Sequence, residues 1–263
     1  PSMYEVRVDT ATTRSMTLAR TVKPPGTVGD WHWEVVLEPS SSATGSDSPL
    51  AITAGSASAY ARYGRVTLYV SASDNQPMIS ASTPYVPLFD NDWWNISWGL
   101  GEHPKHNTAV ESQSFYVRCA KAAEHSDGRI THTGSGVVVG NSESYNNAWS
   151  TNGTVVWGKH DTDGNSRGIG ENRFKGSIQE VRVWAEYIND DAFYQHALAP
   201  TSVVGNTIEQ AYNDLLVRLP FGTDGNKFNH NTTTTITSSL PNTNNAKWSY
   251  QGDGEGALMS NFS

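Results

Sequence analysis

Residues 172–196 read NRFKGSIQEVRVWAEYINDDAFYQH, a strand pattern followed by a helix pattern. Val181 and Val183 alternate with charged residues, which is the period of two expected of a strand whose faces have different surroundings. Ile178 lies out of phase with both valines. Either a β-bulge near Gln179 corrects the phase, or both faces of this strand are covered.

The polar face of the same strand carries Glu180 and Arg182, which can pair with each other or be satisfied across a sheet. A short helix is predicted to follow, capped by Asn189 or Asp190, because a side-chain oxygen there accepts from the free N–H groups of the first turn. Pro200 would end it. The helix would carry Phe193, Tyr194 and His196.

The period of two recurs through most of the chain. Three runs each place one apolar set on a single face: Trp31, Trp33, Val35 and Leu37; Val66, Leu68 and Val70; and Phe115, Val117 and Cys119. The opposite faces are polar and are expected to lie nearer water, as with Glu34 and Glu38, or Tyr116 and Arg118. Segments rich in Pro, Gly, Asn and Asp separate the runs. This pattern predicts an all-β antiparallel sandwich.

Composition limits the classes of function. The chain has 263 residues and a net charge of −8, and only 17% of its residues are charged. No clustered Lys and Arg are available to neutralise phosphates, so nucleic acid is not an expected partner. No apolar run is long enough to predict membrane insertion. The single cysteine, Cys119, falls on an apolar strand face and allows no internal disulfide. The chain begins at Pro1 rather than Met, which predicts a piece of a longer protein.

The quoted stretch resembles the closing strand and following turn of the laminin-G-like, or concanavalin-A-like lectin-glucanase, superfamily. The matching positions are Phe174, Gly176, Ile178, Glu180, Val181, Arg182, Val183, Trp184 and His196. Trp157-Gly158 and residues 92–97 are similar to two other strands of that family. The resemblance covers roughly residues 1–200. It implies an antiparallel jelly-roll β-sandwich with one or two short helices and an extended C-terminal arm.

The last sixty residues differ from the rest of the chain in amino-acid composition. After Pro200 the chain becomes rich in Asn, Thr and Ser, which predicts a boundary there, with a sandwich at 1–200 and a C-terminal arm, linker or docking segment at 201–263. A second short helix is predicted from Thr207, with Gln210 completing a capping box. The apolar side of this helix would be formed by Tyr212, Leu215 and Leu216.

Residues 202–206 and 211–222 look like segments of large virion structural proteins of tailed phages, especially marine phages. In those proteins a laminin-G-like module lies within a longer tail, fibre or baseplate chain. The resemblance implies a non-enzymatic structural module of a virion (tail, fibre, baseplate or capsid decoration), acting in particle assembly or host-surface contact. Its expected partners are other virion structural proteins or copies of itself, and its expected location is the virion.

A carbohydrate-binding adhesin or lectin domain, at a cell surface or outside the cell, is the alternative. Trp93 falls on the opposite parity from the core-facing Trp94, beside Asp92 and Asn95, so it is predicted as an exposed platform for a glycan. A second candidate site combines Tyr145 with Trp149 in a loop rich in Asn. Either aromatic group could instead pack in a turn or against another subunit.

A Ca²⁺ site and glycoside hydrolysis are two further kinds of chemistry. Asp161, Asp163 and Asn165 place oxygen side chains at alternate positions, as calcium loops do, although the EF-hand pattern is incomplete and a polar hairpin tip fits as well. Glycoside hydrolases of the superfamily place two acidic residues at alternating positions on one strand. That run is absent here, because Glu34 and Glu38 are four residues apart. Hydrolysis is therefore the least favoured class.

Overall fold

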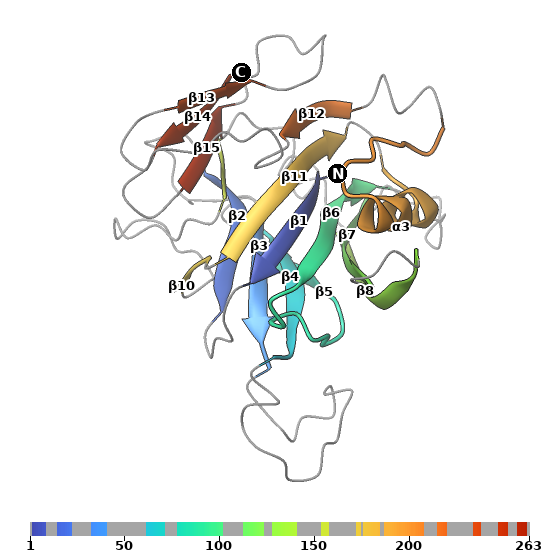
Figure 1. The fold of residues 1–263 in the computed structure, drawn as a ribbon. Helices are drawn as coiled ribbons and strands as arrows, with labels where there is room; N and C mark the ends of the chain where they lie inside the picture. The colour runs from blue at the N-terminus through green and yellow to red at the C-terminus, as the bar shows by residue number, and fades with distance from the viewer. Residues whose placement is uncertain are drawn as a thin grey trace.

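The strands predicted from the period of two assemble into two sheets in a computed structural model of the chain (Figure 1). The structure describes residues 2–8, 15–22, 33–40, 62–71, 78–101, 113–123, 128–140, 154–157, 172–174, 176–184, 187–207, 215–219, 234–237, 247–251 and 257–261. Named strand neighbours pair antiparallel, apart from one parallel pair, β10 with β2. The predicted all-β class is confirmed.

The first sheet has six strands in the order β12-β11-β1-β6-β7-β8. Their bounds are Leu215–Leu219 (β12), Gly176–Trp184 (β11), Ser2–Val8 (β1), Trp93–Gly101 (β6), Gln113–Ala122 (β7) and Ile130–Gly140 (β8). We call it the six-stranded sheet. It places the first strand, β1, beside β11, which is distant from it in sequence.

The second sheet has nine strands, with the path β13-β14-β15-β9-β2-β3-β4-β5 and with β10 beside β2. Their bounds are Thr234–Thr237 (β13), Lys247–Gln251 (β14), Ala257–Asn261 (β15), Thr154–Trp157 (β9), Met16–Val22 (β2), Trp33–Pro39 (β3), Gly64–Val70 (β4), Ile79–Ser82 (β5) and Asn172–Arg173 (β10). We call it the nine-stranded sheet.

The two sheets share one hydrophobic core, so the architecture is a β-sandwich. The nine-stranded sheet contributes the inward residues Trp33, Val35, Leu37, Val66, Leu68 and Val70, and the six-stranded sheet contributes Trp94, Ile96, Trp98, Phe115, Val117, Cys119 and Val181. The rings of Trp33 and Trp98 meet across this core with centroids 5.8 Å apart. Burial of this apolar surface is the main force that holds the sheets together.

A β-bulge in β11 resolves the phase problem of the quoted stretch. Met3 pairs with Arg182 and Glu5 pairs with Gln179, so β11 has one residue more than β1 over the same length. Glu180 lies in the bulge with a φ of 48°, in the left-handed region. The extra residue brings Ile178 onto the core side together with Val181. Both predicted alternatives therefore hold: the bulge is present, and the other face is covered too, because Glu180 and Arg182 are buried.

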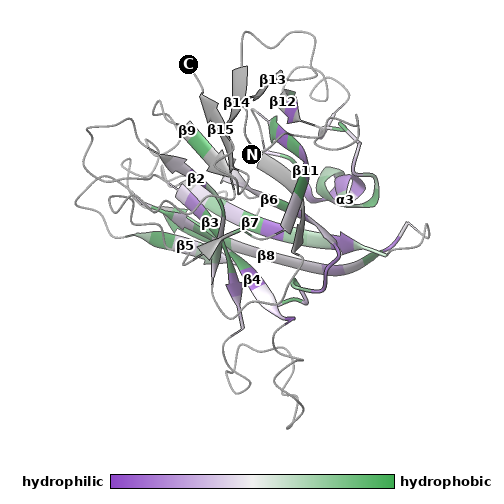
Figure 2. Cartoon of the chain, turned by 60° about the vertical axis from the view of Figure 1, so that its left-hand side comes forward, coloured by the Kyte–Doolittle hydropathy of each residue, from purple (hydrophilic) through white to green (hydrophobic). Residues whose placement is uncertain are grey.

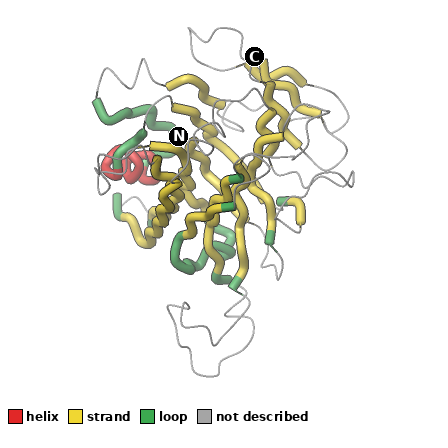
Figure 3. The backbone as a smooth tube through the Cα atoms, turned by 180° about the vertical axis from the view of Figure 1, so that it is seen from behind, coloured by secondary structure: helices red, strands yellow, loops and turns green. Residues whose placement is uncertain are grey.

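The helix predicted after this strand is α3, Asp190–Leu198. Asn189 is its N-cap, and its side chain accepts a 2.8 Å hydrogen bond from the backbone N–H of Ala192. The helix lies against the six-stranded sheet on the face opposite the core, beside β6, β7 and β8 (Figures 1 and 3). It carries hydrophobic and hydrophilic residues together (Figure 2). The buried apolar ones form a second core with Trp184, Ile188 and Leu215.

The second predicted helix is wrong for Leu215 and Leu216, which begin strand β12. Pairing with β11 outweighs the helical spacing, because Leu215 packs beside Trp184 in the second core and Arg218 bonds to Glu180 across the two strands. The remainder of that candidate, residues 208–214, lies outside the described residues. The segment predicted as an arm also supplies β13, β14 and β15, and β15 pairs with β9. The boundary near residue 200 stays a prediction.

The expectation that the polar strand faces lie near water is wrong at several positions. Glu34 is fully buried, and its carboxylate accepts a 2.6 Å hydrogen bond from the hydroxyl of Thr17. Tyr116 and Arg118 are buried as well, because α3 covers that part of the six-stranded sheet. Burial of such polar groups requires partners within the protein. The outer face of the six-stranded sheet therefore holds a polar layer beneath the helix.

Candidate functional site

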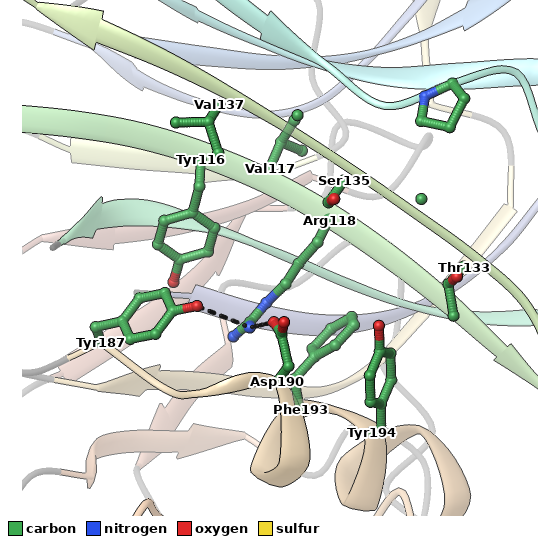
Figure 4. Close-up of a pocket in the computed structure, with 13 residues that line it drawn as sticks. Tyr116, Val117, Arg118, Thr133, Ser135, Val137, Tyr187, Asp190, Phe193 and Tyr194 are labelled. Atoms are coloured by element: carbon green, nitrogen blue, oxygen red, sulfur yellow. Dashed lines mark hydrogen bonds and ion pairs between the residues drawn. The ribbon is translucent and has the colours of Figure 1, made fainter. Parts of the chain in front are cut away.

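A groove of about 270 Å³ opens between the outer face of β7 and β8 and the helix α3 (Figure 4). Its lining comes from three separate parts of the chain: Pro84; residues Tyr116, Val117, Arg118, Thr133, Gly134, Ser135, Gly136 and Val137 of β7 and β8; and Tyr187, Asp190, Phe193 and Tyr194 at the helix. We call it the α3 groove. It combines aromatic rings with hydroxyl groups.

The floor of the α3 groove consists of cross-strand pairs. Tyr116 lies opposite Val137, and Arg118 lies opposite Ser135. Because side chains alternate along a strand, Phe115, Val117 and Cys119 point to the sandwich core while Tyr116 and Arg118 point to the groove side. On β8 the hydroxyls of Thr133 and Ser135 are exposed. The sheet thus presents a row of polar side chains toward the helix.

The wall of the groove is set by the start of α3. Asp190, Phe193 and Tyr194 follow the helical spacing of three and four residues, so they share one side of the helix. The chain entering the helix is held by Asn206, whose side chain bonds to the backbone N–H of Asn189 and to the carbonyl of Tyr187, each at 2.6 Å. These bonds fix where the ring of Tyr187 and the carboxylate of Asp190 lie.

Arg118 is the centre of the site. Its side chain is 5% exposed, and its guanidinium donates to Asp190 at 2.8 Å, to the hydroxyl of Tyr187 at 3.4 Å and to the carbonyl of Ile188 at 2.5 Å (Figure 4). The guanidinium carbon also lies 4.3 Å from the ring centroid of Phe193 and 5.2 Å from that of Tyr116. Arg118 therefore joins the sheet to the helix through charge, hydrogen bonds and cation–π contacts.

The hydroxyls of Tyr116 and Tyr187 stay protonated at neutral pH. Burial raises the pKa of Tyr116 to about 12, although the nearby charge of Arg118 acts in the opposite direction. Burial also raises the pKa of Tyr187. Among the thirteen lining residues, Arg118 and Asp190 are the charged ones, and they form an ion pair. The lining therefore contributes no net charge.

His196 anchors the far side of α3. Its ring stacks on Trp184 with centroids 5.8 Å apart, and Nε2 lies 2.7 Å from the carbonyl oxygen of Val204. Burial, helped by the charge of Arg182, lowers the pKa of His196 to about 3. The imidazole is therefore neutral at physiological pH, and the contact to Val204 identifies Nε2 as the protonated nitrogen that donates. This arrangement fixes the helix to the segment that follows it.

The structure does not bring the residues predicted around Trp93 together as one exposed site. Trp93 is half-buried at the start of β6, whereas Trp94 is fully buried in the core, as their opposite parity predicts. Asp92 and Asp90 bind the ammonium of Lys121 at 2.6 and 2.5 Å. Burial opposes the charge on Lys121, but the two carboxylates outweigh it and raise its pKa. The carboxylate predicted to meet a ligand is therefore engaged with a lysine.

Asn95 lies beneath the helix rather than on a rim. It is 2% exposed, and its amide donates to the carbonyl of Phe193 at 3.2 Å. The other predicted site residues, Tyr145, Trp149, Asp161, Asp163 and Asn165, lie outside the described residues. Within the part of the chain that the structure describes, no three His, Cys, Asp or Glu side chains gather as a metal site requires. The calcium site stays a prediction.

Comparison with known proteins does not assign this chain to a family. No protein-family model matches the chain, and neither does any curated protein. In the described residues, no helix has the length and apolar character needed to cross a membrane. Function is therefore inferred from the resemblances in the sequence and from the geometry of the α3 groove.

Proposed function

We propose that this chain is a non-enzymatic structural module of a phage virion protein, located in the virion and acting in particle assembly or host-surface contact. We propose further that its sandwich has the jelly-roll connections of the laminin-G-like superfamily. The observation that carries the contact role is the α3 groove, which joins four aromatic rings to exposed hydroxyls around a neutralised Arg118–Asp190 pair. Such a mixture suits recognition of a surface.

The positions of the acidic residues support a non-enzymatic role. The paired acids of a glycosidase must both be free to act on the substrate. Glu34 is fully buried, and its carboxylate accepts a hydrogen bond from Thr17. Glu38 is also engaged with Arg65, Thr67 and Tyr69. In the α3 groove the carboxylate of Asp190 is held by Arg118.

A carbohydrate-binding adhesin or lectin domain, extracellular or at a cell surface, is the second candidate. The aromatic lining of the α3 groove favours it, because glycans pack on rings and bond to hydroxyls. A single-site Ca²⁺ at Asp161, Asp163 and Asn165 would accompany either function. The alternatives differ in where the protein is found and in what it binds.

Mass spectrometry of purified particles tests the proposed function. The proposal expects peptides of this chain in particles that have passed through a density gradient, at a constant ratio to the major capsid protein across the particle peak. The expected partners, other virion proteins or further copies of this chain, should appear as cross-links to it in the same particles. Absence of its peptides from intact particles, with the major capsid protein recovered, would rule the virion role out.

A further inference from the structure

We infer that the α3 groove binds one neutral pyranose unit of a glycan, stacked on the tyrosine rings of the helix wall and hydrogen-bonded to the strand hydroxyls. This inference deepens the proposed contact function and rests on it. It differs from the site predicted around Trp93, which lies at the start of β6 and whose Asp92 is paired with Lys121.

The aromatic wall provides a stacking surface. Tyr187 and Tyr194 are both half-buried, so part of each remains accessible, and Tyr194 packs beside Phe193 with centroids 5.5 Å apart. Figure 4 shows the hydroxyl end of Tyr194 directed toward the strands across the groove. The faces of aromatic rings carry partial negative charge and attract polarised C–H groups. A pyranose presents such groups on one face of its ring.

The opposite side of the groove provides hydrogen-bonding groups. Thr133 and Ser135 are exposed on β8, each able to donate and to accept. The carboxylate of Asp190 is 65% exposed, so it retains acceptor capacity beyond its bond to Arg118. A ring bearing several hydroxyls can satisfy groups of both kinds.

The electrostatics favour a neutral ligand. The positive charge of Arg118 is compensated by Asp190 at 2.8 Å, and its side chain is almost fully buried. An anionic sugar would have to displace Asp190 from the buried Arg118, which is unfavourable because a buried charge without its partner is costly. A cationic sugar gains little, because the lining carries no net charge. A neutral sugar requires no such exchange.

The size of the groove limits the ligand to about one ring. Its volume of about 270 Å³ lies just below the roughly 300–1,000 Å³ typical of sites for drug-sized molecules. A longer glycan would therefore place one residue in the groove and extend the rest past the edge strand β8. Affinity for a single ring is expected to be weak, so firm attachment to a cell surface would require several copies of the module bound at the same time.

The test uses the full chain on an array of neutral and charged glycans, followed by isothermal titration with the methyl pyranosides that correspond to the hits. Tyr194→Ala removes the stacking ring and should weaken binding about tenfold. Tyr194→Phe keeps the ring and should weaken it less. Thr133→Val removes a hydroxyl at nearly constant shape. The matched control is Tyr85→Ala, a half-buried tyrosine that stacks with Arg65 outside the groove and should leave binding unchanged.

Three results would overturn the inference: no binding to any neutral glycan by the folded chain, binding that Tyr194→Ala leaves unchanged, or binding restricted to charged sugars. Equal cooperative thermal unfolding of wild type and variants shows that loss of binding is not loss of fold. Failure here leaves the virion role standing if the chain is found in particles. Conversely, glycan binding through Tyr194 by a chain absent from particles would support the adhesin.

Discussion

Glu180 combines a left-handed backbone with a buried carboxylate, at the bulge that sets the phase of β11. Its two oxygens accept from Arg218 on β12 at 3.0 and 3.2 Å, and the guanidinium of the buried Arg182 lies 3.9 Å away. A φ of 48° is costly for a residue with a Cβ. The charge of Glu180 offsets this cost, because it balances two arginines and attaches β12 to the sheet.

Glu180→Gln removes this charge at nearly constant volume. We expect a loss of about 3 kcal/mol in the free energy of unfolding, because two guanidinium groups then lack their counter-charge in a largely buried place. Urea denaturation measures the change. The control is Asp191→Asn, an exposed acid in the first turn of α3 that should cost less than about 1 kcal/mol. Equal effects of the two variants would contradict the role given to Glu180.

His196 makes the attachment of α3 sensitive to acid. Its folded-state pKa of about 3 lies below the ordinary value near 6.5, so the unfolded chain takes up a proton at a higher pH than the folded one. The stabilisation is complete above pH 6.5 and is lost as the pH falls toward 3. From pH 7 to pH 5 this group alone should remove about 2 kcal/mol of stability.

His196→Gln isolates that contribution, since glutamine can donate to the carbonyl of Val204 but does not titrate. The variant should show a weaker decline in stability between pH 7 and pH 5 than the wild type, measured by denaturation at each pH. The other titrating groups are common to both proteins and cancel in the difference. Parallel declines would show that folding does not lower the pKa of His196.

At the level of secondary structure, strands β8 and β5 approach each other very closely at one side of the sandwich. A Cβ built on Gly136 would lie 2.0 Å from the carbonyl oxygen of Ser82. Gly136→Ala must therefore push the strands apart, and we expect a loss of about 1–3 kcal/mol with a lower Tm. Gly128→Asn is the control, at a position with open space and a φ of 60° that asparagine tolerates. If Gly136→Ala is as stable as Gly128→Asn, β8 and β5 do not approach each other as closely as described.

The N-cap of α3 links the stability of the helix to the shape of the groove. Asn189→Ala removes the acceptor for the N–H of Ala192 and should cost about 1 kcal/mol. Asn189→Ser keeps an acceptor and should restore most of it. Thermal unfolding measures both variants. If the two variants unfold at the same temperature, the side chain at position 189 does not stabilise the helix by accepting from the N–H of Ala192.

Much of this architecture follows from local pattern. The out-of-phase Ile178 indicated the bulge in β11, and Asn189 indicated the start of α3. The strand at Leu215 was not predictable in this way, because LLVRL carries no alternation that distinguishes it from a short helix, and its pairing with β11 is a long-range contact. The burial of Glu34, Tyr116 and Arg118 was not predictable either. Local sequence does not show which outer sheet face another element covers.

For the chain as a whole, the α3 groove could not be read from the sequence because its parts are far apart. Tyr116, Thr133 and Tyr194 come from β7, β8 and α3, and their proximity depends on strand pairing and on the docking of the helix. The sequence signal for Tyr116 and Arg118 was their polar parity opposite the core residues of β7, which predicted a polar face but not the helix that covers it. Trp93 and Asp92 are adjacent in sequence, so a candidate site there was easier to predict than the α3 groove.

Amide NMR during titration with the neutral methyl pyranoside bound most tightly tests whether the α3 groove is the contact site. We predict the largest shifts at the backbone amides of Thr133, Ser135 and Tyr194, with little change at Asp92 and Trp93. The reverse distribution, or shifts that leave β8 and α3 untouched, would contradict the site proposed for this protein.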